Sequence, residues 1–211
     1  MVRADLAIKS LVPATVLVGA VILAMHGFGN DGLRQALRGT ARIALILFLL
    51  AYVASPLNLL LPSRATQWLV ANRTTIGVCF GLSISTHIML IIALFIEGGW
   101  LPKGVNPADL YVGIPGLIFA IFMTVTSFHY FKRLVPSVAW HWSHRIGLHL
   151  IWLIYVACLV DSFGRKSPPS SPWLYLPLIC LLLFAAALRF LVWTQNTKIK
   201  LKAQVSEGHN D

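Results

Sequence analysis

The chain has 211 residues, of which 57% are hydrophobic and 11% charged, and its mean hydropathy is +0.76. Soluble domains carry about 25% charged residues, so this composition excludes a disordered chain, a nucleic-acid-binding domain and an ordinary soluble enzyme. The net charge of +10 comes from basic residues clustered between apolar runs, which is typical of a membrane protein whose loops meet anionic lipid. We therefore expect membrane lipid, and no nucleic acid, among its partners.

Apolar stretches without a charged residue predict the helices. Five of them have at least 21 residues, which is enough for a helix to cross a hydrocarbon core of roughly 30 Å. A sixth, 146–160, has 15 residues and extends an apolar stretch that Arg145 interrupts; a long arginine side chain can reach the interface from there. The pattern predicts an all-α integral membrane protein, a bundle of six transmembrane helices over residues 8–26, 41–61, 75–96, 109–131, 143–162 and 173–195.

The same pattern predicts the domain organisation and the orientation. Six helices leave no room for a second domain, so we expect a single transmembrane domain over residues 1–196 and a short tail over residues 197–211. Ten Lys and Arg residues fall on the side of the two termini and six on the other. Because cytoplasmic loops carry an excess of these residues, both termini are expected in the cytoplasm. No small-residue cleavage site follows the first apolar stretch, so we expect it to remain as helix 1.

Histidine is the ionisable residue that recurs within the apolar stretches. Such a residue is costly inside a bilayer and indicates a functional site. Several imidazoles in one bundle suggest axial ligands of a buried haem iron, whereas a single one could simply hydrogen-bond to a neighbouring helix. Carboxylates near the predicted spans, Glu97 and Asp161, fall at helix ends, which argues against a proton-relay pump or a di-iron carboxylate site. The histidines concerned are His26, His87, His129, His141, His144 and His149.

Short motifs occur in a fixed order between residues 39 and 160. They are Ser55-Pro56-Leu57, then Arg73-Thr74-Thr75-Ile76-Gly77 with His87 ten residues after the glycine, then Thr126-Ser127, then Trp140 followed by His144-Arg145. This ordered set resembles the ferric-reductase-like transmembrane family, and within it the haem-binding membrane subunits of bacterial methionine-sulfoxide reductase systems. The resemblance implies that helices 2–5 surround haem b, and that the chain is an electron-transfer subunit of an oxidoreductase in the bacterial inner membrane.

The resemblance also implies that histidines of helices 3 and 5 ligate iron. His87 matches the helix 3 ligand and His144 the first helix 5 ligand, but Ala157 occupies the position of the second. At 1.5 Å per residue, His149 lies about 9 Å from the depth of His87, and His144 about 16 Å. We therefore predict that His87 and His149 face one cavity and ligate one iron. His144 is then a candidate, together with His129, for a second haem; the alternative is that it lies at the interface beside tryptophans.

Other residues near the predicted ligands could contact the cofactor. Arg73 and Arg145 begin the two ligand helices, and their guanidinium groups could pair with haem propionates; the positive-inside rule also explains them. Gly77, Gly81 and Ser85 recur every four residues on helix 3. Small residues at that spacing either let helices approach closely or leave room for a porphyrin beside the ligand.

Electrons would have to come from another molecule. The sequence has no Gly-x-Gly-x-x-Gly fingerprint of a dinucleotide-binding domain, so the expected donor is a quinol or a separate reductase that supplies a flavin or quinone. A periplasmic oxidoreductase, ferric iron or another oxidant would accept the electrons on the outer side. The alternative is a non-redox membrane protein, either a small transporter or a structural subunit, including a family member that has lost haem.

Overall fold

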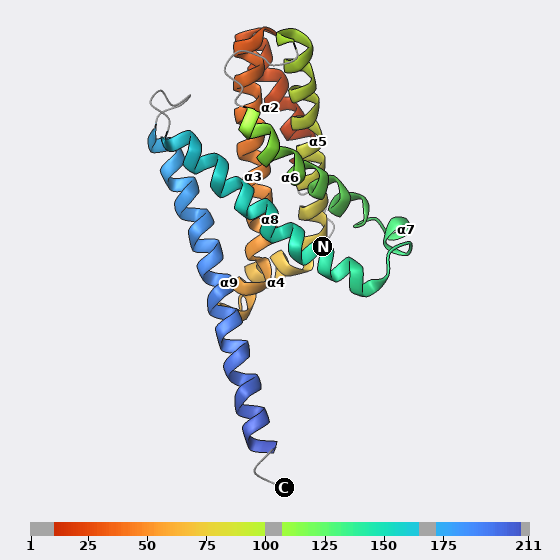
Figure 1. Cartoon of the computed structure of the whole chain (residues 1–211), viewed down its shortest axis with the longest axis vertical. Coiled ribbons are helices and arrows are strands. Elements are labelled where there is room, and N and C mark those ends of the chain that lie inside the picture. The colour runs from red at the N-terminus through yellow and green to blue at the C-terminus, as the bar shows by residue number, and fades with distance from the viewer. Residues whose placement is uncertain (1–10, 100–106, 165–171, 208–211) are drawn as a thin grey trace.

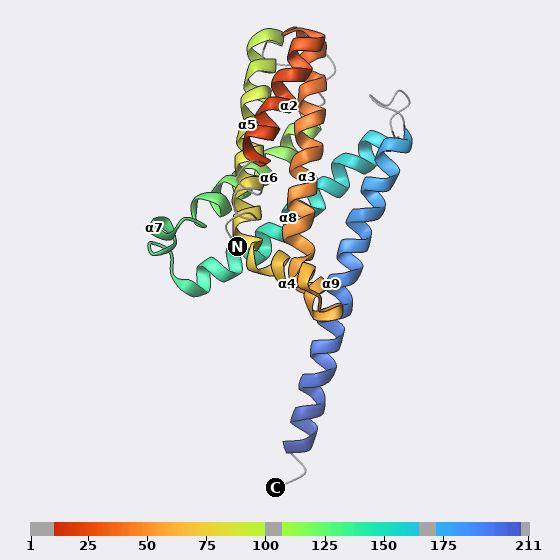
Figure 2. The same cartoon turned by 180° about the vertical axis from the view of Figure 1, so that it is seen from behind.

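The computed structural model describes residues 11–99, 107–164 and 172–207. In these ranges the regular elements are helices: α2 (Leu11–His26), α3 (Asn30–Leu60), α4 (Arg64–Ala71), α5 (Arg73–Gly98), α6 (Pro107–Val125), α7 (His129–Lys132), α8 (Ser137–Gly164) and α9 (Pro172–Glu207). Helices α2, α3 and α5 run side by side, α8 crosses them obliquely, and α9 extends below the bundle (Figures 1 and 2). We call the end that holds the α2–α3 turn the upper end and the end that holds α4 the lower end.

Membrane character follows from helix length and composition. Within the described ranges, four helices are long and apolar enough to cross a membrane, namely α3, α5, α8 and the Trp173–Gln195 part of α9. Helices α2 and α6 contain shorter apolar stretches, Thr15–His26 and Leu110–Val125. Soluble proteins rarely expose wide apolar patches, yet α8 and α9 expose many large apolar side chains. The predicted all-helical membrane class is therefore confirmed, and four of the six expected spans meet both criteria.

The predicted start of helix 2 was wrong. The charge-free stretch predicts this helix only from residue 41, whereas α3 begins at Asn30. Arg34, Arg38 and Arg42 follow one another at four-residue spacing and so share one face of the helix, where all three line a partly open cavity between the helices. The three charged residues therefore did not mark a loop. Their side chains lie along a cavity between helices instead.

Other boundaries also moved. Helix α6 ends at Val125, six residues before the predicted end at 131, and α8 begins at Ser137, six residues before 143. Helix α9 continues to Glu207, so the residues 197–207 expected in a separate tail extend this helix instead. The first three residues of the predicted helix 8–26 lie outside the described residues.

Helix α4 was not predicted, although the sequence carries a signal for it. The Ser63 hydroxyl accepts a hydrogen bond from the backbone N–H of Thr66, and the Thr66 hydroxyl oxygen accepts one from the N–H of Ser63. This reciprocal capping box starts a helix. The two turns that follow connect the lower ends of α3 and α5.

The main core lies where α3 packs against α5. Phe48 of α3 has its ring centroid 5.6 Å from those of Phe80 on α5 and Tyr155 on α8, and 5.3 Å from that of Tyr52. Lipid tails are as apolar as these side chains, so close packing rather than transfer from water holds such helices together. Helix α3 also contacts α2, α4 and α9, which makes it the central helix of the fold.

Close packing of α5 against α6 depends on Gly81, which gives a first prediction. A Cβ atom at Gly81 would collide with the Thr124 side chain, whereas a Cβ at Gly77 would meet nothing within 4 Å. We expect Gly81→Ala to lower the free energy of unfolding by about 1–3 kcal/mol. The matched change Gly77→Ala should be neutral or stabilise by up to about 1 kcal/mol, because alanine favours helix. Thermal unfolding in detergent measures both, and equal losses would contradict this packing role.

Candidate functional site

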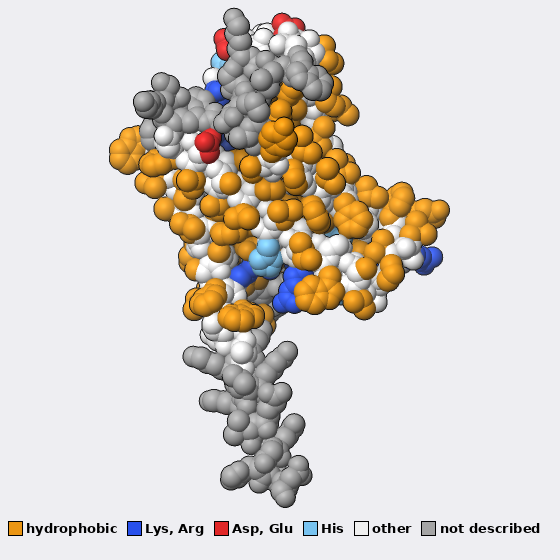
Figure 3. Space-filling view, in the orientation of Figure 1, with side chains coloured by type: hydrophobic (Ala, Val, Ile, Leu, Met, Phe, Trp, Pro, Cys, Tyr) orange, Lys and Arg blue, Asp and Glu red, His pale blue; other side chains and the backbone are white. Residues whose placement is uncertain are grey.

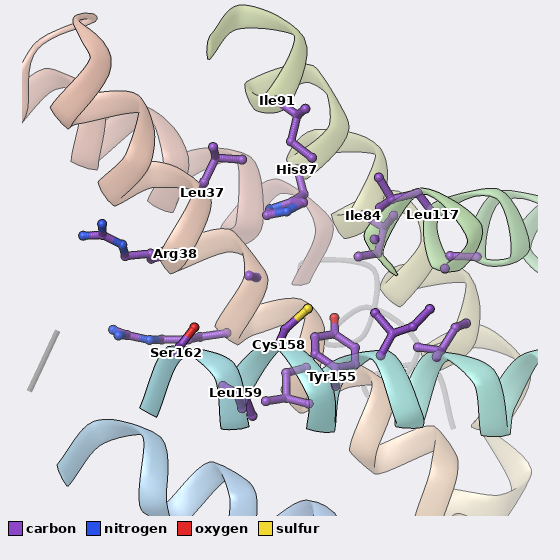
Figure 4. Close-up of a pocket in the computed structure, with 18 of the residues that line it drawn as sticks. Leu37, Arg38, Ile84, His87, Ile91, Leu117, Tyr155, Cys158, Leu159 and Ser162 are labelled. Carbon is purple, nitrogen blue, oxygen red and sulfur yellow. The ribbon is translucent and has the colours of Figure 1, made fainter. Parts of the chain in front are cut away.

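A cavity of about 600 Å³ lies in the upper half of the bundle, between α3, α5, α6, α8 and α9. Cavities of roughly 300–1,000 Å³ hold most small ligands and cofactors of proteins. Most of the lining side chains are apolar, including Ile84, Leu117 and Leu159 (Figure 4). The polar and sulfur-containing side chains that line it are Arg34, Arg38, Arg42, His87, Tyr155, Cys158, Ser162 and Tyr175.

His87 reaches from α5 toward α3 at the edge of this cavity (Figure 4). Its Nδ1 atom lies 3.2 Å from the Thr40 hydroxyl oxygen on α3. The same hydroxyl donates to the backbone carbonyl of Ala36 at 2.9 Å and lies 3.1 Å from that of Leu37. Thr40 is completely buried, and His87 is partly buried.

The network around Thr40 gives the Nδ1 atom of His87 a hydrogen-bond partner. A threonine hydroxyl has a single proton, and the two backbone carbonyls beside it can only accept. When Thr40 donates its proton to one of these carbonyls, its oxygen accepts from Nδ1–H of His87. The Nε2 lone pair of His87 is then left for a group in the cavity, which is the state in which an imidazole binds a metal ion or accepts a hydrogen bond.

Tyr155 supplies a second polar group to the same cavity. Its hydroxyl is buried and has no hydrogen-bond partner in the described part of the chain. The ring stands on α8 and directs the hydroxyl into the space between α8 and α5 (Figure 4). A buried hydroxyl without a partner costs about 1–3 kcal/mol, so this atom points to a ligand that would satisfy it.

The upper end also carries the carboxylates among the described side chains. Asp31 lies in the first turn of α3, Glu97 in the last turn of α5, and Asp161 in the last turn of α8. The charges of Arg34, Arg42 and Asp31 all act on Arg38. The arginine row of α3 therefore sits in a mixed-charge region at the upper edge of the cavity.

The prediction that His87 and His149 face one cavity was wrong. The His149 side chain is exposed, and its Nδ1–H donates to the Arg145 carbonyl at 2.7 Å. The α8 residues that line the cavity begin at Ile151. His149 is two residues earlier, which is about 200° away around the helix. The depth estimate took no account of the rotation of α8, which decides which of its side chains face the cavity.

His144 also lies outside the cavity. Its Nδ1 atom lies 3.2 Å from the Trp140 carbonyl and its ring centroid 4.2 Å from that of Trp140. Its Nε2 atom is buried and has no partner within the described residues. The His129 side chain, expected as its companion in a second haem site, lies outside the described side chains. The His26 and His141 side chains are exposed.

The three residues expected to contact a cofactor lie away from the cavity. Arg73 Nη1 donates to the Ser55 hydroxyl at 3.2 Å, at the lower end of α5. The Arg145 guanidinium lies 5.9 Å from the Trp142 ring centroid. Gly77 has open space beside it. Arginines that could meet acidic groups of a ligand in the cavity instead come from α3, on the segment that was expected to be a loop.

Two of the short motifs contact each other directly. Trp140 donates from Nε1 to the Thr126 carbonyl at 3.0 Å, and Lys132 Nζ lies 4.3 Å from the Trp140 ring centroid. Thr126 follows the last residue of α6, where carbonyls have no partner within the helix. Trp140 therefore caps α6 and fixes the turn that leads to α8.

The Pro56 motif has a structural partner that the sequence analysis missed. Proline has no backbone N–H, so Pro56 inside α3 cannot donate to the Tyr52 carbonyl one turn earlier. Arg189 of α9 donates to that carbonyl instead, from Nε at 3.2 Å and from Nη2 at 2.9 Å. Its guanidinium also lies 3.9 Å from the Tyr52 ring centroid. The sequence feature that could have predicted this contact is Arg189 inside one apolar stretch together with Pro56 inside another.

The described residues contain no group of three or more His, Cys, Asp or Glu side chains that could hold a metal ion. Comparison of the chain with protein-family models, curated proteins and solved structures finds no match. The candidate site is therefore described from its own residues. It is a largely apolar cavity among long apolar helices, with the His87 imidazole, the unpartnered Tyr155 hydroxyl and the arginine row of α3.

Proposed function

We propose that this chain is a membrane-embedded electron carrier that binds one haem b in the cavity, with His87 as an axial ligand of the iron. The position of His87 carries the proposal, because its side chain lines the cavity and its Nδ1 atom is held by Thr40, so that Nε2 could bind the iron. We further propose that α2 and α6 cross the membrane with the four longer helices, which gives six spans. The buried hydrogen bond between the Thr15 and Ser83 hydroxyls, 3.0 Å long, supports α2 as part of the bundle.

Three observations fit a haem group. The cavity has the volume and the apolar wall that a largely apolar macrocycle needs. Ligand histidines are usually held through the second ring nitrogen by a neighbouring group, and Thr40 does this for His87. The arginine row of α3 lies at the edge, where Arg38 and Arg42 would meet propionates. Bound haem would supply one-electron chemistry, with a potential set by ligation and burial.

The cavity favours one haem with one histidine ligand. Tyr155 and Cys158 of α8 line the cavity together with His87, while His144 and His149 do not line it. We therefore propose neither a second histidine ligand nor a second haem. Arg38 and Arg42 take the role that the sequence analysis assigned to Arg73 and Arg145.

The proposed direction of electron transfer rests on the distribution of basic residues and on the resemblance to the ferric-reductase-like transmembrane family. The lower end carries more basic residues, so we propose that it faces the cytoplasm, with both termini, in a bacterial inner membrane. A quinol or a reductase carrying flavin or quinone would donate the electrons. A periplasmic oxidoreductase, or another acceptor on the outer side, would receive them. The chain itself would then serve as the electron-transfer subunit of an oxidoreductase.

Spectroscopy of the purified chain tests this function. We expect a reduced-minus-oxidised spectrum of b-type haem and about one haem per chain in a pyridine haemochrome assay. A single histidine ligand should give a high-spin ferric spectrum. A folded preparation that stays colourless after expression with added haem precursor would overturn the proposal and favour a non-redox membrane protein.

A second candidate follows from the Tyr155 hydroxyl. A lipid-soluble ligand with hydrogen-bonding oxygens, such as a quinone, could accept from Tyr155 and approach His87 in the same cavity. Tyr155→Phe separates the two candidates, because it removes the hydroxyl and keeps the ring against Phe48. Haem content should survive this change under the first proposal. Loss of bound quinone from Tyr155→Phe, in a preparation without haem, would favour the second.

A further inference from the structure

The lower end of the bundle concentrates positive charge. The carboxylates among the described side chains lie at the upper end, while histidine and basic side chains gather near the lower end (Figure 3). Three arginines come from three helices: Arg73 from α5, Arg145 from α8 and Arg189 from α9. Arg73 and Arg189 both bind the turn of α3 that runs from Tyr52 to Ser55, and Arg189 lies close enough to Arg73 and Arg145 for their charges to affect it.

The lower turns of α3 hold this arginine cluster together. Arg189 binds the Tyr52 carbonyl, and Arg73 binds the Ser55 hydroxyl, which lies three residues further along the same helix. The Tyr52 ring meets His149 edge-on at 6.1 Å between centroids, and His149 binds the carbonyl of Arg145. Arg189 and Arg73 therefore bind the same turn of α3, at Tyr52 and Ser55. His149, one turn after Arg145 on α8, packs against the Tyr52 ring.

The cluster retains hydrogen-bond donors. A guanidinium has five N–H groups; Arg73 uses Nη1 on Ser55, and Arg189 uses Nε and Nη2 on Tyr52. Positive charge of this density at the end of apolar spans is electrostatically unfavourable without an anion. Guanidinium groups bind phosphate oxygens in paired geometry.

We propose that Arg73, Arg145 and Arg189 bind the phosphate of an anionic phospholipid headgroup at the lower end of the bundle. The depth fits, because the neighbouring helix α4 exposes Trp68 at 41%, and tryptophan favours the membrane–water interface. Large apolar side chains are exposed on the same helices as two of the arginines, Ile146 on α8 and Phe190 on α9, and acyl chains could lie against them. A free phosphate would gain nothing from that apolar surface. The site does not depend on haem, because none of the three arginines lines the cavity.

Lipid binding to the purified full chain tests the proposal. The probes are phosphatidylglycerol, phosphatidylcholine and inorganic phosphate, each titrated into detergent micelles and measured by native mass spectrometry and by the thermal unfolding shift. Arg73→Gln and Arg145→Gln are the informative variants, since Arg189 also holds the Tyr52 carbonyl. Arg64→Gln is the matched control, because Arg64 is a basic residue of the lower end on α4. Unfolding without lipid confirms that each variant folds.

We expect phosphatidylglycerol to bind more tightly than phosphatidylcholine. Each glutamine variant should weaken it about fivefold, and the double variant about 25-fold if the two arginines act independently. Arg64→Gln should change the affinity less than about twofold. Equal losses in all variants would show only a general surface attraction. Inorganic phosphate that competes fully with the lipid would assign a free-anion site. Loss of haem from Arg145→Gln with unchanged lipid binding would assign the cluster to a cofactor. Each of these three results would overturn the lipid site.

Discussion

Replacing His87 with alanine should abolish haem binding while the helices stay folded. His87 is the histidine that lines the cavity, and its Nε2 lone pair is the proposed iron ligand. His149→Ala should keep the full haem content, because the His149 side chain is exposed and bound to the Arg145 carbonyl. Pyridine haemochrome assays give the haem content, and circular dichroism gives the helix content of both variants.

The hydrogen bond between Thr40 and His87 gives a second test of this prediction. Thr40→Val keeps the shape of the side chain but removes the oxygen that orients His87. Loss of such a supporting group commonly weakens metal binding about 10–100-fold, so Thr40→Val should lose haem on dilution. Thr40→Ser should retain it, because serine keeps the hydroxyl. Haem retained by His87→Ala, or lost from His149→Ala alone, would show that the cavity assignment is wrong.

Replacing Arg189 with methionine should destabilise the fold by about 1–3 kcal/mol, because it leaves the Tyr52 carbonyl unpaired inside the bundle. The cause can be isolated by restoring the missing donor in α3. In Pro56→Ala the backbone N–H of residue 56 can donate to the Tyr52 carbonyl. In that background, Arg189→Met should cost less than half as much. Unfolding titrations of the wild type, both single variants and the double variant give the coupling free energy.

Additive losses would contradict this interpretation of Arg189. A coupling free energy below about 0.5 kcal/mol is the range found for independent sites, and it would mean that Arg189 acts through its charge or its contact with the Tyr52 ring. Arg64→Gln serves as the control for removal of a basic side chain at the lower end. It should change the free energy of unfolding by less than about 0.5 kcal/mol, because its side chain is exposed.

Sequence periodicity could not show how far the helices extend past their charge-free cores. Arg34, Arg38 and Arg42 lie on a helical face that borders the partly open cavity, and residues 137–142 form the start of α8 rather than a loop. The capping box at Ser63 and Thr66 was visible in the sequence and could have predicted α4. The start of α4 could therefore be predicted from local capping residues, whereas the starts of α3 and α8 depend on how the helices pack.

By itself, the sequence determined that this is a helical membrane protein. A bilayer core requires long charge-free apolar stretches whose backbone groups hydrogen-bond within a helix, and the sequence has several of them. It also singled out His87, since an imidazole deep in such a stretch needs a partner. The tertiary structure decided which groups meet. The rotation of α8 turns Tyr155 into the cavity and His149 away from it, and a helix from the end of the chain brings Arg189 to the carbonyl that Pro56 leaves without a donor. Both depend on the angles at which distant helices cross, and periodicity within one helix carries no information about those angles.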